Sequence, residues 1–177
     1  MLNFKLTRLF WNKRATFGML EEESFGFRCY TVERPFCDCT RMTATQKTKF
    51  CLPTGTYPMM HRFDPLTLRP FLALCGRGVY REAHFCTDRP AGTGSIAVGK
   101  SYDESGVTRE GEVVLEKMSQ MLETAIGQNR LPTRSKSGLI LLDIALAADF
   151  HEKKVMVEEE PDDWDEVDFD CIDCTEG

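Results

Sequence analysis

The sequence lacks any uninterrupted apolar run of the length that a membrane-spanning helix needs, about 18 residues. Its N-terminal stretch, MLNFKLTRLFWNKR, is apolar in part, but Lys5 and Arg8 interrupt it. A secretory signal peptide needs an unbroken apolar centre. We therefore expect no signal peptide, no transmembrane segment, no membrane contact and a cytoplasmic location.

Several motifs that bind nucleotides or metals are absent too. The sequence has no P-loop, no dinucleotide-binding glycine fingerprint and no HExxH helix. Each of these motifs places specific groups around a phosphate or a metal ion. Their absence excludes the commonest nucleotide-dependent and zinc-dependent enzymes, and we expect no cofactor.

Basic residues are missing from the end of the chain. Of the 28 acidic residues, eleven follow position 157, whereas none of the 22 Lys and Arg residues does. The 17 remaining acidic residues leave the preceding part at about +5, although the whole chain carries −6. We predict one domain over residues 1–150, since a 177-residue chain has room for one substantial core, and an acidic tail over residues 151–177. A body this weakly basic does not indicate direct nucleic-acid binding.

Cysteine, in contrast, is plentiful, with eight residues. In a cytoplasmic protein of this size we interpret most of them as small buried hydrophobes or free thiols. Two close pairs, Cys37 with Cys39 and Cys171 with Cys174, could together supply four thiolates to zinc. The pairs lie far apart in the chain, and the acidic surroundings of Cys171 disfavour a thiolate there. We therefore predict no metal site.

Alternating apolar and polar residues predict β-strands through the first half of the chain. The pattern is clear over residues 2–10, and residues 15–20 and 27–33 should form a hairpin with an acidic tip. Residues 34–49 lose this periodicity and predict a long exposed loop. Further strand-like apolar runs cover residues 51–63, 71–74, 79–85 and 95–99.

One amphipathic helix is expected late in the chain. Thr108 can cap it, Gly127 should end it, and apolar residues recur between them at helical spacing. The last apolar run, residues 138–148, favours a buried strand for its first half, with a helix over residues 143–150 as the alternative. We predict a mainly β protein of the α+β class: a single mixed or antiparallel β-sandwich or barrel-like domain with one principal helix.

A candidate site lies between residues 81 and 99. A turn rich in Pro and Gly, residues 90–94, separates His84 from Ser95 and should bring them together. A base beside a hydroxyl is the minimum for nucleophilic catalysis. Asp88 or Glu33 could orient the imidazole. Cys86, which shares a strand face with His84, is a second candidate nucleophile.

A structural interpretation of the same residues stands beside the catalytic one. A serine in a glycine-rich turn commonly uses its hydroxyl to cap the backbone. An isolated histidine among apolar residues is commonly a hydrogen-bonded structural group. The sequence leaves both interpretations of His84 and Ser95 open, and it favours chemistry less at His61 and His151.

Five short motifs occur in the order of a known family: Thr16-Phe-Gly-Met-Leu20, Phe27-Arg-Cys-Tyr-Thr-Val-Glu33, Leu52-Pro-Thr-Gly-Thr-Tyr57, His84 and Gly94-Ser-Ile-Ala-Val-Gly99. In these motifs the chain resembles the domain-of-unknown-function family numbered five-six-seven-five, which is found in bacteria, phages and other mobile elements. The resemblance covers about the first two-thirds of the chain, and several motifs in order weigh more than any one of them.

The resemblance implies a remote likeness to L,D-transpeptidases. Members of the family read His-x-Gly-Asn and then Gly-Cys-Ile, similar to the transpeptidase site in which a cysteine thiolate attacks a peptidoglycan stem peptide. This chain departs from that pattern, because Phe85-Cys86-Thr87 follows His84 and Ser95 stands where the cysteine would be. A serine hydroxyl is far less acidic than a thiol and needs a well-aligned base.

The tail interleaves large apolar residues with carboxylates: Trp164, Val167, Phe169 and Ile172. Dense negative charge favours a solvated, disordered tail. The apolar residues indicate a segment that docks on a basic, partly apolar surface, either of the protein's own body, where it could act as an autoinhibitory flap, or of a protein partner.

Two classes of function remain open. The first is a non-catalytic or degenerate member of a phage or mobile-element family, acting as a binding or virion-associated accessory protein through its acidic tail. The second is a peptidoglycan-directed acyl transferase or hydrolase that uses Ser95 and His84. The absent cysteine and the absent export signal favour the first.

Overall fold

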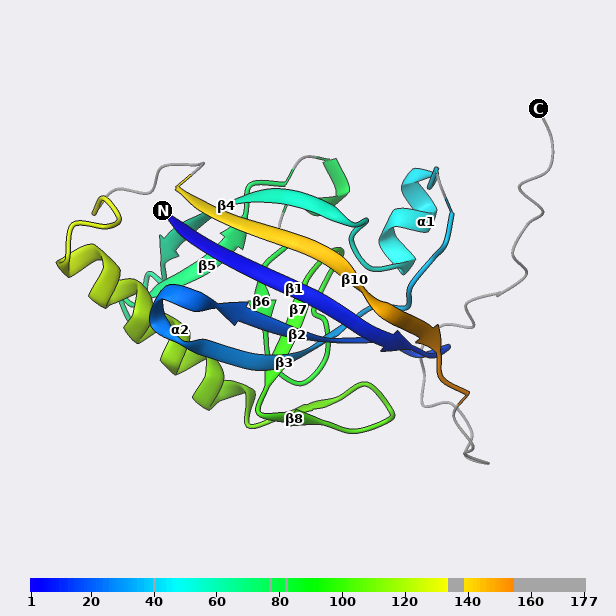
Figure 1. Cartoon of the computed structure of the whole chain (residues 1–177). Coiled ribbons are helices and arrows are strands. Elements are labelled where there is room, and N and C mark those ends of the chain that lie inside the picture. The colour runs from blue at the N-terminus through cyan, green and yellow to red at the C-terminus, as the bar shows by residue number, and fades with distance from the viewer. Residues whose placement is uncertain (40, 77, 82, 134–138, 155–177) are drawn as a thin grey trace.

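The computed structural model describes residues 1–39, 41–76, 78–81, 83–133 and 139–154 (Figure 1). Its main feature is an eight-stranded mixed sheet in the order β5-β4-β10-β1-β2-β3-β7-β6. These strands are β1 (Leu2–Trp11), β2 (Thr16–Glu22), β3 (Phe27–Glu33), β4 (Gly55–Phe63), β5 (Pro70–Leu74), β6 (Phe85–Cys86), β7 (Ile96–Gly99) and β10 (Ile140–Glu152). A small second sheet pairs β8 (Ser101–Tyr102) with β9 (Thr108–Arg109), and the helices are α1 (Ala44–Lys49) and α2 (Gly111–Gly127).

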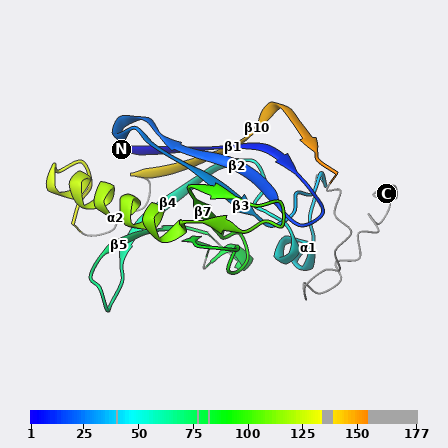
Figure 2. The same cartoon turned by 90° about the horizontal axis from the view of Figure 1, so that it is seen from below.

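The sheet curls until its two edge strands almost meet. The backbone amide of Leu74, at the end of β5, donates to the Ala83 carbonyl at 2.9 Å. A single antiparallel bridge also joins Ala73 to His84. Figure 2 shows the result, with β1, β2 and β10 on one side and β5 and β7 on the other. The expectation of a mainly β, barrel-like domain is confirmed.

Strand β1 lies at the centre of the sheet, between β10 and β2. Its alternating sequence places Leu2, Phe4 and Leu6 in the core, each fully buried. Arg8 follows in the same inward series and is also fully buried. A charged residue therefore occupies a core position, and the site described below depends on it.

The predicted hairpin is present as β2 and β3, paired from Thr16 with Glu33 to Glu22 with Phe27. A short 3₁₀ turn over Glu23–Phe25 forms the acidic tip. Gly26 ends that turn with a φ of 61°, a conformation that glycine adopts without steric cost. The hairpin carries one wall of the hollow described below.

Helix α2 buries the expected apolar stripe against β5 and β7. The buried residues recur at three- and four-residue spacing: Val114, Met118, Met121, Leu122 and Ala125. Its end at Gly127 is confirmed, but its beginning differs from the expectation. Thr108 belongs to β9 and donates its hydroxyl to the Asp88 carbonyl, so the helix begins only after Glu110, whose φ is 53°.

Three further expectations need correction. The expected strand over residues 79–85 is wrong for its first part, since Gly78–Tyr80 form a 3₁₀ turn and β6 covers only Phe85–Cys86. The supposed loop over residues 34–49 contains α1, which Thr43 and Gln46 begin with a reciprocal capping box. Residues 143–150 are strand and not helix, because β10 continues beside β1 to Glu152, although β4 pairs with it only as far as Ile144. Pairing with β1 over residues 140–146, and again at His151 and Glu152 after an irregularity in the register, satisfies the backbone groups of β10 there. Within the described part of the chain, no helix has the length and apolar character to cross a membrane.

Candidate functional site

The turn between β6 and β7 brings His84 and Ser95 side by side. The Ile96 amide donates to the His84 carbonyl at 3.1 Å, and the His84 amide donates to Ser95 Oγ at 3.3 Å. The chain reverses through Gly92 and Gly94, whose φ values of 108° and 73° lie where other residues are strained. The two residues are thus tied together by their backbones as well as by proximity.

The Ser95 hydroxyl occupies a poor position for nucleophilic attack. Ser95 is only 2% exposed, and its oxygen accepts the backbone hydrogen bond from His84. A serine nucleophile must instead give its proton to a base while a substrate approaches the oxygen. The observed contact corresponds to the backbone-capping interpretation.

Cys86 is the second candidate nucleophile, and it is held by the same turn. Its Sγ donates to the Arg89 carbonyl and accepts from the Ala91 amide, each at 3.4 Å. Burial raises the pKa of this thiol, and the nearby Asp88 carboxylate raises it further, whereas the Ala91 amide lowers it. A thiol with a raised pKa is protonated at neutral pH and reacts slowly.

The two candidate orienting carboxylates lie on different parts of the barrel. Asp88 is exposed, with a φ of 61°, and its carbonyl accepts hydrogen bonds from the amide and the hydroxyl of Thr108. Glu33 is 2% exposed and belongs to β3, where both of its carboxylate oxygens accept from Arg8. The Asp88 carbonyl therefore holds β9 in place, and the Glu33 carboxylate neutralises the buried Arg8.

Among the ion pairs of the described residues, Arg8–Glu33 is the one with both side chains buried. Arg8 Nε lies 2.8 Å from Glu33 Oε2, and Nη2 lies 2.7 Å from Oε1 and 2.6 Å from the Leu52 carbonyl. Burial alone would lower the pKa of Arg8, but the Glu33 carboxylate outweighs it, so the pKa is raised. Arg8 is therefore permanently charged, and it links β1, β3 and the segment before β4.

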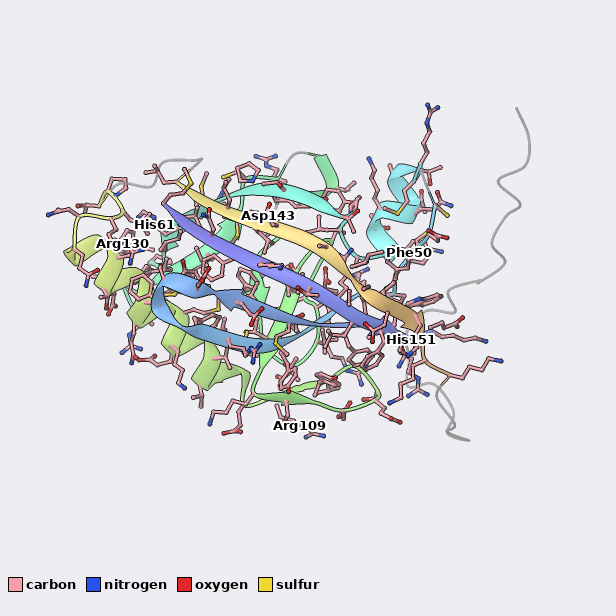
Figure 3. All side chains as sticks on the ribbon, in the orientation of Figure 1. Phe50, His61, Arg109, Arg130, Asp143 and His151 are labelled. Atoms are coloured by element: carbon pink, nitrogen blue, oxygen red, sulfur yellow. The ribbon has the colours of Figure 1, made fainter. Side chains whose placement is uncertain are left out.

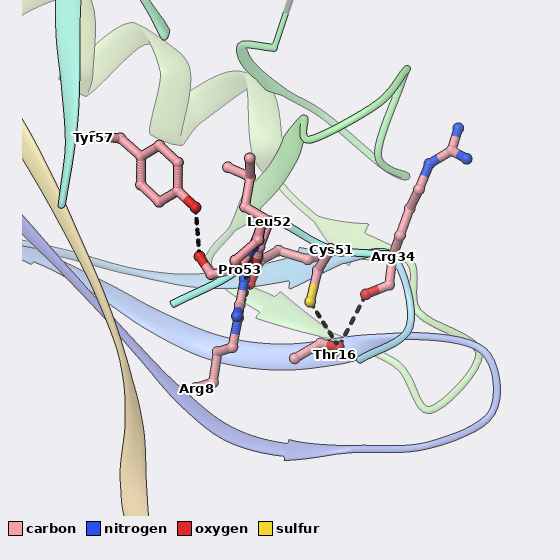
Figure 4. Close-up of polar contacts among 8 residues, drawn as sticks. Arg8, Thr16, Arg34, Cys51, Leu52, Pro53 and Tyr57 are labelled. Atoms are coloured by element: carbon pink, nitrogen blue, oxygen red, sulfur yellow. Dashed lines mark hydrogen bonds and ion pairs between the residues drawn. The ribbon is translucent and has the colours of Figure 1, made fainter. Parts of the chain in front are cut away.

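Thr16, Cys51 and Tyr57, three neutral polar residues, lie near Arg8 (Figure 4). Thr16 Oγ1 donates to the Arg34 carbonyl at 2.9 Å and contacts Cys51 Sγ at 3.9 Å, while the Tyr57 hydroxyl donates to the Pro53 carbonyl at 2.7 Å. Burial raises the pKa of both Cys51 and Tyr57 to about 12. The cluster thus ties residues 51–57 to the barrel and carries no ionised nucleophile at neutral pH. The position of Arg8 in the inward series of β1 was the signal that could have revealed it.

The two remaining histidines lie toward opposite ends of the sheet (Figure 3). His61 is buried, with its ring 5.6 Å from that of Phe63. His151 is exposed near the end of β10, with Nδ1 2.7 Å from the Asp149 carbonyl. Neither forms a cluster of metal-binding residues, since no such cluster of three or more occurs in the described ranges.

A hollow of about 350 Å³ lies between the β2–β3 hairpin and α2. We call it the basic-rimmed hollow. Its lining combines five apolar or aromatic residues with three cations: Met19, Phe27, Cys29, Tyr30, Val114, Arg28, Lys100 and Lys117. Cys29 and Val114 are buried, and burial raises the pKa of the Cys29 thiol to about 12. The floor is therefore uncharged, and the charge is confined to the rim.

The three rim cations are exposed and weakly paired. Arg28 Nη2 lies 2.7 Å from Glu21 Oε1, and Lys100 Nζ lies 2.7 Å from Glu110 Oε1. Both ion pairs are on the surface. Within the described ranges, no carboxylate lies at ion-pair distance from Lys117. Sequence reasoning missed this site, because positions 28, 100 and 117 are brought together only by the fold. The tail residues Trp164, Val167, Phe169 and Ile172 lie outside the described residues.

The chain matches no family model, no curated protein and no solved structure. The resemblance to the domain-of-unknown-function family and to L,D-transpeptidases therefore stays a prediction from short motifs.

Proposed function

We propose that this chain is a binding protein, and that the basic-rimmed hollow receives an acidic peptide segment bearing large apolar side chains. The observation that carries the proposal is the composition of the hollow, with three exposed cations around an apolar floor. Cations at a rim attract carboxylates and orient a segment, while an apolar floor supplies most of the binding energy. The two requirements select a ligand that is both acidic and apolar.

The existing ion pairs do not obstruct such a ligand. Exposed pairs such as Arg28–Glu21 and Lys100–Glu110 stabilise a protein by only about 0–1 kcal/mol. An incoming carboxylate can replace either partner at little cost, and Lys117 needs no exchange. An indole seated in the hollow contributes roughly 25 cal/mol for each Å² of apolar surface that it buries, before the entropic cost of association is subtracted. An aromatic side chain together with two or three carboxylates therefore suits both the floor and the rim.

Acyl transfer by His84 and Ser95 has less support. The Ser95 oxygen is 2% exposed and accepts the His84 amide, and the Cys86 thiol has a raised pKa. Both facts favour a non-catalytic role for the turn. The assignment of this role to a phage or mobile element, in a host cytoplasm or on a virion, rests on the motif resemblance alone.

The proposal is tested with a labelled peptide of the sequence of residues 158–177. The protein in this assay is a full-length variant in which serine replaces four tail residues: Trp164, Val167, Phe169 and Ile172. Its own tail then lacks the apolar side chains with which it could compete against the peptide. Fluorescence anisotropy should show saturable binding that Lys117→Glu weakens at least tenfold. The matched control is Arg62→Glu, an exposed residue of β4 outside the hollow, which should leave the affinity unchanged.

Absence of peptide binding, or equal loss in both charge-reversal variants, would overturn the proposed site. The catalytic alternative is examined with serine- and thiol-reactive acyl probes and with peptidoglycan stem peptides. Labelling that disappears in both Ser95→Ala and His84→Ala would favour the enzyme over the binding protein.

A further inference from the structure

We propose that the acidic tail of the same chain, residues 158–177, occupies the basic-rimmed hollow and masks it until a competing segment displaces the tail. This inference rests on the proposed function, since it names the resting occupant of the same site. It follows from where the described chain ends, from the length of chain beyond that point and from the opposite charges of tail and rim.

The described chain ends beside an aromatic run that leads to the hollow. The Lys153 amide donates to the Trp11 carbonyl at 2.6 Å, which fixes the end of β10 against β1. The Lys153 ammonium lies 5.3 Å from the centre of the Phe10 ring. The centre of the Phe10 ring lies 6.2 Å from that of Tyr102, and the Tyr102 ring centre lies 5.4 Å from that of Tyr30, a residue of the hollow. These contacts place the Tyr30 ring within about 17 Å of the Lys153 ammonium.

The chain beyond Lys154 is long enough to cover that separation. Nine residues lie between Lys154 and Trp164, and nine extended residues span at most about 30 Å. Even when the length of the Lys153 side chain is added to that separation, Trp164 can reach the hollow, and Val167, Phe169 and Ile172 can follow. The tail needs no rearrangement of the barrel to arrive there.

Charge favours the same occupant. Residues 158–177 carry eleven carboxylates and no basic residue, whereas the hollow presents three cations. Because the tail is tethered, its effective concentration at the hollow is on the order of 1 mM. An intrinsic Kd of about 0.1 mM would then leave the closed form about tenfold more populated than the open form. A weak contact is thus sufficient for masking, and it remains displaceable.

Trp164 gives a direct test in the full chain. The sequence has two tryptophans, and Trp11→Phe leaves Trp164 as the only one. Phenylalanine keeps an aromatic ring beside Phe36, which lies 5.9 Å from the Trp11 ring. Acrylamide should quench the fluorescence of Trp164 several-fold less in the Trp11→Phe variant than in the free peptide of residues 158–177. Lys117→Glu, Arg28→Glu or 0.5 M NaCl should each raise the quenching toward the peptide value, whereas Arg62→Glu should not. Circular dichroism checks that each variant is folded.

Three results would overturn the inference. Quenching equal to that of the free peptide means that the tail is not held. Protection that falls on dilution means that the tail binds a second copy. Protection that survives both Lys117→Glu and Arg28→Glu means that the tail docks elsewhere. In each case, saturable peptide binding by the chain with serines at the four apolar tail positions would leave the proposed function standing, so the two failures are distinguishable.

Discussion

Arg8 and Glu33 form a two-pronged ion pair inside the barrel, with nitrogen–oxygen distances of 2.8 and 2.7 Å and side chains that are 0% and 2% exposed. The pair joins the central strand β1 to β3. Through the Leu52 carbonyl it also holds the segment that leads into β4. The barrel therefore holds a buried charge that would keep only the Leu52 carbonyl of these acceptors if the Glu33 carboxylate were lost.

Glu33→Gln should lower the free energy of unfolding by about 3–5 kcal/mol, because it leaves Arg8 buried without a carboxylate. The matched control is Glu21→Gln, which removes one partner of the exposed Arg28–Glu21 pair and should cost less than about 1 kcal/mol. Urea denaturation followed by circular dichroism measures both. Similar losses in the two variants would mean that the buried pair contributes no more than a surface pair.

Ser95→Ala should destabilise the protein by about 1–3 kcal/mol, since the His84 amide loses its hydrogen-bond acceptor. Ser101→Ala, at an exposed position of β8, should change stability by less than about 0.5 kcal/mol. Thermal unfolding of the two variants provides the comparison. If Ser95→Ala were as stable as Ser101→Ala, the backbone-capping role of the hydroxyl would be wrong.

Gly94→Ala should also be strongly destabilising, by more than about 2 kcal/mol. The φ of Gly94 is 73°, and an added Cβ would lie 2.8 Å from the Tyr80 ring, so backbone strain and a steric clash add together. Gly127→Ala, at the end of α2, meets no atom within 4 Å and should stabilise by up to about 1 kcal/mol. Opposite signs for the two substitutions, measured by chemical denaturation, are the expected result; equal signs would contradict it.

Stability should fall as the pH rises above 9, and Cys51 should contribute to the fall. Burial raises the pKa of this thiol from 9.0 to about 12 in the folded protein. The unfolded chain therefore loses the thiol proton first, and stability that is present below pH 9 is lost between pH 9 and 12, at no more than about 1.4 kcal/mol per pH unit. Cys51→Ala has no thiol to ionise, so its free energy of unfolding should fall less than that of the wild type between pH 8 and pH 10. The difference in stability between the two proteins should therefore narrow over that range. A constant difference in urea denaturation across that range would contradict the assignment.

The alternation of apolar and polar residues was sufficient to predict most of the barrel. The predicted strand over residues 2–10 is β1, and the hairpin over residues 15–33 is β2 and β3. The errors occurred where one sequence pattern allows two structures. The segment 143–150 has no clear period, and pairing with β1 at residues 143–146, resumed at His151, continues it as strand. Helix α1 has no buried face to give it a period, and its capping residues Thr43 and Gln46 are the only local signal.

The candidate sites show the same limit. The Pro- and Gly-rich turn correctly suggested that His84 and Ser95 meet, but no sequence pattern states that the hydroxyl accepts a backbone amide. Arg8 was recognised only as an interruption of an apolar stretch, although its position in the inward series of β1 indicates burial. The basic-rimmed hollow draws on β3, on the residue after β7 and on α2, so its cations become neighbours only through long-range pairing.

Zero-length carbodiimide coupling of the full chain, with the products mapped by mass spectrometry, tests the binding of an acidic segment in the hollow most directly. This reagent joins a carboxylate to an amine only when the two are in contact. We predict amide links within single chains between Lys117 or Lys100 and carboxylates of residues 158–177, and we expect 0.5 M NaCl to suppress them. Tail carboxylates that couple to lysines outside the hollow, such as Lys49 of α1, and not to Lys100 or Lys117 would contradict the account.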